Sequence, residues 1–254
     1  MTIAIMQPYF MPYIGYFQAI NAVDKYILYG NVNFEKKSWV NRNRLMQRNG
    51  AIEPMVVPLK MKSSNALIKD IAIDYSTDWQ RRLLRSIQTN YGKAPYYEET
   101  FSLLTSILSA PYEMLMELNT ESIKAVAKHL DITTEIISDN SLYDDMEERL
   151  RKSDDVYVEF PYMLKTRPNR RTARVIEMCK REESNHYINA IGGMELYCKE
   201  ELAQYGIQLE FIKTKPIVYD QFNNKFEPYL SIIDVLMHNG KNKTKQMLEE
   251  YELV

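Results

Sequence analysis

The chain has 254 residues, and its 45% hydrophobic and 26% charged residues are typical of a globular protein with a sizeable core. A net charge of −2 argues against nucleic acid as the principal partner, because proteins that bind nucleic acid present basic surfaces. No apolar run approaches the roughly 18 to 20 residues of a membrane span, no secretory signal is visible, and Cys179 and Cys198 lack metal-ligand spacing. We therefore expect a cytoplasmic protein with free thiols, no metal site and no membrane span.

The N-terminal region predicts a strand, a rigid loop, a helix and a second strand. The apolar run Thr2–Met6 is followed by Pro8 and Pro12, which exclude a regular helix or a central strand. From Tyr13 the apolar residues recur at helical spacing, and Asp24–Tyr29 has strand character. Such units form parallel sheets that bind ligands beyond the carboxyl ends of their strands. We expect the proline loop to lie at that edge.

The next segment, Asn33–Leu45, gathers cations and carboxamides around Trp39. This mixture is compatible with a solvated face. It also suits an anionic ligand with a planar or sugar part, because guanidinium groups pair with phosphate and indole offers a stacking face. The candidate ligand contacts of the N-terminal region are Gln7, Tyr9, Tyr13, Lys37, Trp39, Asn41, Arg42, Asn43 and Arg44.

The phrase IMQPYFMPYIGYFQAINAVDKYILYGNVNFEKKSWVNRNRL, Ile5–Leu45, resembles the opening of the WbqC-like family. Proteins of that family are typically encoded among bacterial genes for O-antigen and other surface-polysaccharide synthesis. The resemblance therefore implies this pathway context, with modification of an activated amino sugar as the expected step.

The turn Tyr13-Ile14-Gly15-Tyr16 is similar in layout to the HxGH turn of nucleotidylyltransferases. In those enzymes the two histidines contact phosphates at the helix start. Tyrosine can hydrogen-bond a phosphate but cannot carry a positive charge. This departure argues against nucleotidyl transfer, whereas a related nucleotide-binding sheet stays compatible with the sequence.

The middle of the chain predicts helices between about residues 76 and 130, with Asn119 and Thr120 capping the last one, and then a β-branched strand at Leu130–Asp139. We expect a single WbqC-like domain over residues 1–254, with these helices as an insertion. The basic run Phe160–Arg171 is compatible with a solvated turn or with a second phosphate-contacting segment.

The stretch Ser184–Ile212 resembles a later motif of the same family. It predicts a strand, a glycine-pair loop and a helix whose N-terminus would attract anions. The candidate contacts here are Tyr187, Asn189, Gly192 and Gly193. His186 is the candidate general base because imidazole is the side chain most often used for proton transfer in catalysis, although a lone histidine can also be a structural residue. Asp220 is its candidate partner or an alternative base.

Together these features predict an α/β fold, with a mostly parallel, nucleotide-binding-like sheet flanked by helices. The expected activity is transfer of an acyl or aminoacyl group to a nucleotide-linked amino sugar. If the donor is an acyl-carrier-protein thioester, no cofactor is needed. The alternatives are a non-catalytic sugar-nucleotide or carrier-binding protein and a nucleotidylyltransferase-like enzyme. Each of these three hypotheses requires the proline loop, the Trp39 segment and the His186 motif to line one shared cavity.

Overall fold

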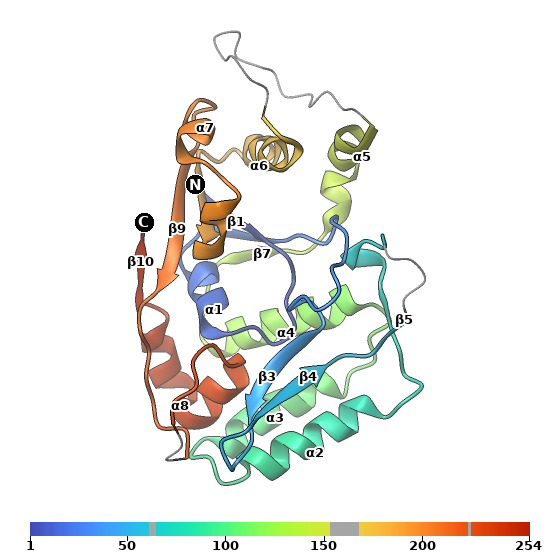
Figure 1. Cartoon of the computed structure of the whole chain (residues 1–254), viewed down its shortest axis with the longest axis vertical. Coiled ribbons are helices and arrows are strands. Elements are labelled where there is room, and N and C mark those ends of the chain that lie inside the picture. The colour runs from blue at the N-terminus through green and yellow to red at the C-terminus, as the bar shows by residue number, and fades with distance from the viewer. Residues whose placement is uncertain (61–64, 153–167, 223–224) are drawn as a thin grey trace.

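Six strands form the central sheet of the protein, in the order β10-β9-β8-β1-β2-β7 (Figure 1). The structure is a computed structural model and describes residues 1–60, 65–152, 168–222 and 225–254. Five strands run parallel, and β10 joins the edge antiparallel to β9. The strands are β1 (Thr2–Met6), β2 (Lys25–Leu28), β7 (Glu135–Ile137), β8 (His186–Ala190), β9 (Gln208–Thr214) and β10 (Tyr251–Leu253).

The predicted mostly parallel α/β sheet is therefore confirmed. Counted in chain order, the parallel strands lie 3-2-1-4-5, with β1 at the centre between β2 and β8. This is the strand order of doubly wound nucleotide-binding folds, in which ligands bind outside the carboxyl ends of the strands where the order reverses. Here that point lies between β1 and β8.

Helices cover both faces of the sheet because successive side chains of each strand point to opposite sides. Ile3 and Ile27 pack against α5 (Asp144–Lys152), α6 (Arg170–Arg181) and α7 (Lys199–Ala203). Ala4 and Leu28 face the other core, which contains α1 (Ile14–Asn21), α4 (Leu115–His129) and α8 (Ile232–Met247). Gly240 interrupts α8 with a φ of 64°.

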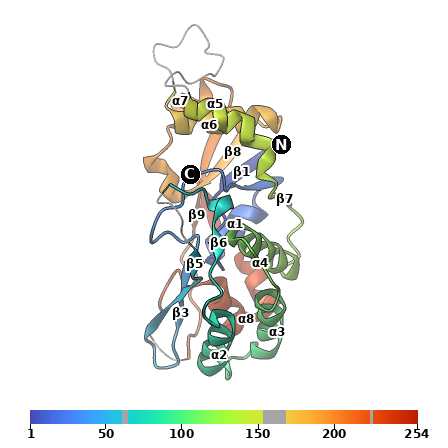
Figure 2. The same cartoon turned by 90° about the vertical axis from the view of Figure 1, so that its right-hand side faces the viewer.

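The described residues between β2 and β7 (29–60 and 65–134) hold two small antiparallel sheets and three α-helices. The β3–β4 and β5–β6 pairs precede α2, α3 and α4, and α3 packs with α8. Figure 2 shows α2 and α3 at the end of the molecule away from α5, α6 and α7, with α4 between them and the central sheet. Within the described residues, no helix is both long and apolar enough to cross a membrane. The bounds are β3 (Arg42–Met46), β4 (Ile52–Val56), β5 (Leu59–Lys60), β6 (Ala72–Ile73), α2 (Trp79–Tyr91) and α3 (Tyr97–Leu108).

Two local predictions are wrong. Asn119 and Thr120 do not cap a helix, because α4 already begins at Leu115 and both residues are buried within it. The glycine pair does not open a helix either: a 3₁₀ turn, η3 (Ile191–Glu195), follows β8, and the five-residue α7 begins only at Lys199. The remaining 3₁₀ turns are η1 (Ile68–Asp70) and η2 (Asn140–Tyr143).

Candidate functional site

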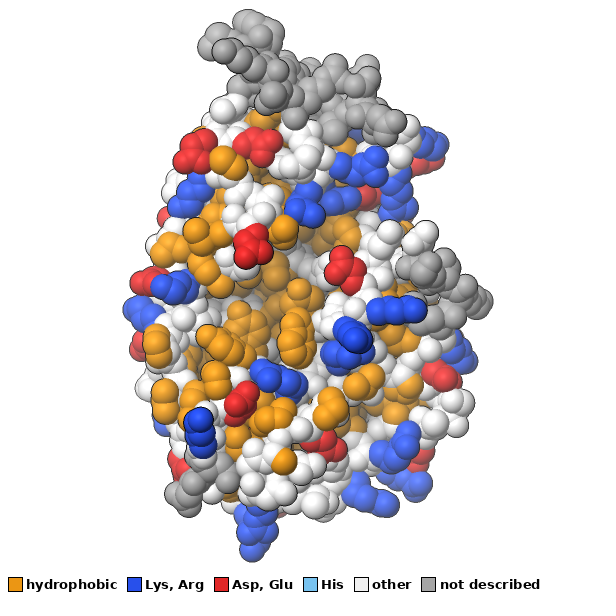
Figure 3. All heavy atoms as spheres, viewed as in Figure 1, with side chains coloured by type: hydrophobic (Ala, Val, Ile, Leu, Met, Phe, Trp, Pro, Cys, Tyr) orange, Lys and Arg blue, Asp and Glu red, His pale blue; other side chains and the backbone are white. Residues whose placement is uncertain are grey.

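A cleft of about 740 Å³ lies at the carboxyl ends of the central strands. Met6 and Gln7 at the end of β1, Tyr29 after β2 and Tyr187 on β8 contribute to its floor. The loop after β2 forms one wall, and α5 and α6 form the other. In Figure 3 apolar and aromatic side chains run through the centre of this face, with Lys and Arg side chains grouped above and to the right. We call this cavity the main cleft.

The proline loop at its edge is held by buried amides of distant elements. Asn119 Nδ2 donates to the carbonyl oxygens of Pro8 (2.8 Å) and Val40 (2.7 Å), which ties the loop to the Trp39 segment. Asn43 Nδ2 donates to the carbonyls of Phe10 (3.1 Å) and Met11 (2.7 Å). The loop is thus fixed by hydrogen bonds in the core, and its tyrosine rings are presented in set positions.

The N-terminal part of α6 brings three arginines into the cleft lining: Arg170 and Arg171 in its first turn and Arg174 in its second. Asn169 caps this helix, since its Oδ1 accepts from the backbone N–H of Arg171 (2.9 Å) and Thr172 (3.0 Å). Cations at a helix N-terminus oppose the helix dipole, and this first turn contains no acidic residue. Folding stability therefore does not account for Arg170 and Arg171, whereas attraction of an anion would.

Arg174 is the arginine of this group with a carboxylate partner. It forms a two-point ion pair with Glu147 of α5, through Nε to Oε1 and through Nη2 to Oε2 (3.0 Å), and the Tyr29 hydroxyl also donates to Glu147 Oε1. The Glu147 side chain is only 3% exposed. Burial raises the pKa of Tyr29, and the Glu147 carboxylate raises it further. This trio joins the two helices and the strand end, and so fixes the cleft wall.

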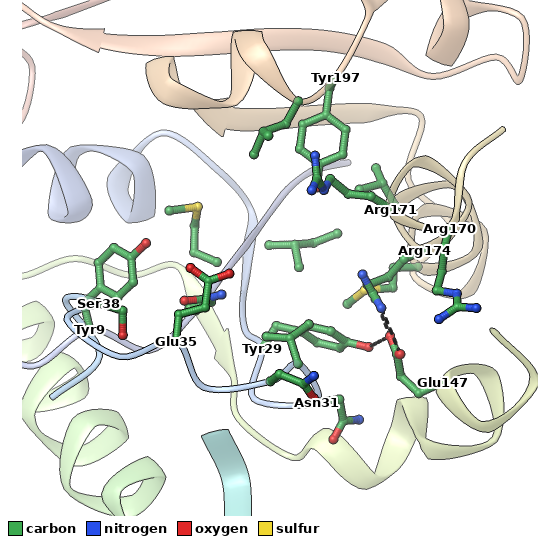
Figure 4. Close-up of a pocket in the computed structure, with 18 of the residues that line it drawn as sticks. Tyr9, Tyr29, Asn31, Glu35, Ser38, Glu147, Arg170, Arg171, Arg174 and Tyr197 are labelled. Carbon is green, nitrogen blue, oxygen red and sulfur yellow. Dashed lines mark hydrogen bonds and ion pairs between the residues drawn. The ribbon is translucent and has the colours of Figure 1, made fainter. Parts of the chain in front are cut away.

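Arg170 and Arg171 are exposed and have no carboxylate partner among the residues that the structure describes. Figure 4 shows Arg171 beside Tyr197 at the cleft wall, with Arg170 pointing outward. Burial raises the pKa of the Tyr197 phenol, and the charges of Arg171 and Arg174 lower it in part. Arg171 therefore offers a guanidinium group to the cleft next to an aromatic ring.

The opposite wall offers acceptors and a carboxylate. Glu35 is exposed and lines the cleft near Tyr9, whose pKa is raised by burial and, to a smaller extent, by Tyr13 and Glu35. The Glu35 side chain has no hydrogen-bond or ion-pair partner in the described part of the chain. Asn31 Oδ1 and Ser38 Oγ are buried there without hydrogen-bond partners among those residues. These groups remain available to a ligand.

The structure brings five of the predicted ligand contacts into the main cleft: Gln7, Tyr9, Lys37, Trp39 and Tyr187. Tyr13 and Arg44 instead line a smaller neighbouring cavity together with Tyr9 and Trp39. Arg44 pairs with Glu227 at 3.4 Å and lies over the Trp39 ring at 5.9 Å. Arg42 begins β3 and lines neither cavity.

The amides of Asn41 and Asn43 are used by the fold. Asn41 Nδ2 donates to the Val57 carbonyl (2.9 Å), and Asn43 holds the proline loop as described above. Tyr16, at the position of the second HxGH histidine, is buried, and its hydroxyl donates to the Gln7 carbonyl at 2.9 Å. That hydroxyl is therefore turned to the backbone, so it does not supply the phosphate contact of the nucleotidylyltransferase layout.

His186 lies at the opposite end of the sheet from the cleft, so the expected convergence of three segments on one cavity holds for the proline loop and the Trp39 segment, but from the His186 motif only Tyr187 reaches the cleft. It is the first residue of β8 and pairs in register with Thr2, the first residue of β1. Four residue steps along a strand separate the two edges by about 13 Å. Its Nδ1 hydrogen-bonds Thr2 Oγ1 (3.1 Å), and its Nε2 lies 2.5 Å from Glu210 Oε2. Asp220 is exposed beyond β9 and is not part of the cleft lining.

Of the glycine pair, only Gly193 serves close packing beside the end of β8. A Cβ on Gly193 would lie 2.9 Å from Asn189 Cγ, whereas one on Gly192 would meet open space. Asn189 Nδ2 donates to the Tyr187 hydroxyl (2.7 Å), and its Oδ1 accepts from the backbone of Ala190 (2.7 Å). None of Asn189, Gly192 and Gly193 belongs to the cleft lining.

Sequence reasoning missed the contributions of Tyr29, Glu147, Arg174 and Tyr197. Part of the predicted phosphate-contacting run, residues 160–167, lies outside the described residues, but its last members, Arg170 and Arg171, line the cleft. A signal was present: Asn169 is an N-cap residue, and arginines directly after a cap oppose the helix dipole. Among the described residues, no group of three or more His, Cys, Asp and Glu side chains could hold a metal ion.

Comparison with known proteins supports the family assignment. An uncharacterized protein of Mycobacterium tuberculosis, Rv1507c, is 27% identical over 241 residues, which cover 94% of each chain. No solved structure matches the sequence. Residues 7–246 match the model of the WbqC-like protein family, so the chain belongs to that family.

Proposed function

We propose that this protein is a transferase of surface-polysaccharide precursor synthesis, which moves an acyl or aminoacyl group onto the amine of a nucleotide-linked sugar. The observation that carries the proposal is the first turn of α6, where Arg170 and Arg171 stand beside the carboxyl ends of β1 and β8 with no carboxylate partner among the described residues. Guanidinium groups suit a diphosphate, and this edge is where sheets of such topology bind nucleotides. The WbqC-like family supplies the pathway context.

Glu35 is the group that we assign to proton transfer, in place of His186. The sugar amine attacks the carbonyl carbon of a thioester carried by an acyl carrier protein; a C–N bond forms and the C–S bond breaks. The proton of the amine passes to the Glu35 carboxylate and from there to the leaving thiolate, so atoms and charges balance. Glu35 suits this role because it is exposed in the cleft and has no partner in the described part of the chain.

Calorimetric titration with a panel of nucleoside diphosphates and nucleotide sugars tests the proposal. We expect at least one nucleotide sugar to bind, and Arg171→Ala to weaken its binding. Adding acyl-carrier-protein thioesters should then release thiol, and Glu35→Gln should abolish this release while binding persists. Binding without turnover would indicate a non-catalytic binding protein, magnesium-dependent pyrophosphate release would indicate nucleotidyl transfer, and the absence of any binding would contradict the proposal.

A further inference from the structure

A second cavity of about 300 Å³ opens beside the main cleft. Tyr9 and Trp39 line both cavities, so the two share a boundary. The second cavity is otherwise walled by Pro12, Tyr13 and Tyr229, with Asn43 and Arg44 as its polar members. We call it the aromatic pocket. Its lining is mostly aromatic, whereas the main cleft is lined by several arginines.

One ring of this pocket, that of Tyr229, is held in place at some cost to folding. Tyr229 is 68% exposed, Trp39 is 44% exposed, and Tyr229 adopts a φ of 58°, which is unfavourable for a residue with a side chain. Tyr229 meets Tyr13 edge-to-face with ring centroids 6.0 Å apart. Exposed aromatic rings held by a strained backbone indicate a binding role, because neither feature stabilises the fold.

The polar groups of the pocket differ in what they can still bind. Asn43 is occupied, since its Nδ2 holds the proline loop and its Oδ1 accepts from the backbone N–H of Arg44 (2.8 Å). Arg44 makes two long contacts, to Glu227 Oε1 (3.4 Å) and to the Tyr229 carbonyl (3.5 Å). Its buried Nε has no hydrogen-bond partner among the described residues. Arg44 therefore retains donor capacity toward a ligand.

We propose that the aromatic pocket holds the hexose ring of the nucleotide-linked sugar whose diphosphate lies on the α6 arginines. A hexose combines apolar C–H faces, which pack on aromatic rings, with a rim of oxygens, which accept from Arg44. The sugar amine then lies at the boundary formed by Tyr9 and Trp39, on the wall that carries Glu35. This inference rests on the proposed function and assigns the sugar subsite within it.

Titration of the full chain with UDP and with UDP-glucosamine, and with matched pairs of other nucleotides and their amino sugars, tests the assignment. We expect one sugar nucleotide to bind at least about tenfold more tightly than its nucleoside diphosphate, a factor that corresponds to about 1.4 kcal/mol. Tyr229→Gly removes the ring and also suits the positive φ, so the fold should be preserved. This variant should lose the tenfold difference but keep the affinity for the nucleoside diphosphate, and Tyr229→Phe should retain both.

Two results would overturn the inference. If every sugar nucleotide binds no more tightly than its nucleoside diphosphate, or if Tyr229→Gly weakens both ligands equally, the aromatic pocket does not recognise the sugar. In either case nucleotide binding at the α6 arginines would still stand. If no nucleotide of either kind binds the wild-type chain, the proposed function fails and the sugar subsite fails with it.

Discussion

Removing Arg170 and Arg171, the α6 arginines that lack a carboxylate partner in the described part of the chain, should raise folding stability slightly while weakening ligand binding strongly. Both side chains are exposed in the first turn, where a cation opposes the helix dipole by about 0.3–1 kcal/mol. Exposure to solvent favours the lower end of that range, so the Arg170→Ala/Arg171→Ala variant should gain roughly 0.6–1 kcal/mol. In a chain of this size that corresponds to a rise in melting temperature of roughly 1–4 °C.

The expected effect on binding has the opposite sign. Arg171 lies at the cleft wall, where a hydrogen bond from its guanidinium to a charged ligand contributes about 1.5–3 kcal/mol to binding. Arg170 points outward, so it acts as a screened surface charge and contributes less than about 1 kcal/mol. A combined loss of about 2 kcal/mol or more raises the Kd of the nucleotide sugar at least about 30-fold. The loss should shrink as salt is added, because outward charges are screened.

Lys180 provides the matched control, since it is an exposed cation in the last turn of the same helix. Lys180→Ala should lower the melting temperature slightly, because a cation at the C-terminus favours the dipole, and should leave the Kd unchanged. Differential scanning calorimetry and titration calorimetry measure the two quantities. An arginine double variant that is destabilised by more than about 1 kcal/mol, or that binds as tightly as the wild type, would refute the reasoning.

Three other predictions concern the cleft wall, the aromatic pocket and pH. Glu147→Ala leaves the largely buried charge of Arg174 without its partner. Urea unfolding should show that the free energy of unfolding falls by about 2–4 kcal/mol, and a fall of less than about 1 kcal/mol would argue against a structural ion pair. Gly15→Ala places a Cβ 2.4 Å from the Tyr13 ring, which must then move within the aromatic pocket. Titration should therefore show a larger loss of affinity for the sugar nucleotide than for the corresponding nucleoside diphosphate, and equal losses would contradict this. Burial lowers the pKa of His238, against the opposing charges of Asp234 and Asp220, so the neutral form is favoured in the native state. The neutral His238 side chain therefore stabilises the native state above the pKa of about 6.5 that histidine has in the unfolded chain, and this stabilisation is lost as the pH falls through the lower pKa of the folded state. In His238→Asn the free energy of unfolding should therefore decline less steeply between about pH 7 and pH 5.

The helices, strands and caps that neighbouring residues determine were predictable from the sequence. The apolar run Thr2–Met6 forms β1 with the predicted bounds, and the helix predicted after the proline loop is α1. Ser231 was also predictable as a cap, and its Oγ accepts from the backbone N–H of Ile233 at 3.3 Å. In each case neighbouring residues decide the conformation, so periodicity and capping chemistry suffice.

The site depended on contacts that no local pattern reveals. Arg171 reaches the cleft because α6 forms the wall that faces the loop after β2. Asn119 is buried because its side chain ties together two loops from distant parts of the chain. The interpretation of His186 could have been improved from sequence alone. It stands at the amino end of its strand, and ligands of parallel sheets bind at the carboxyl ends.

The position of a bound nucleotide sugar in a crystal of the complex tests the account most directly. The account predicts diphosphate oxygens about 3 Å from the Arg171 guanidinium and the hexose ring against Tyr229 and Trp39. Electron density for the ligand at the other edge of the sheet, beside His186 and Glu210, would contradict it.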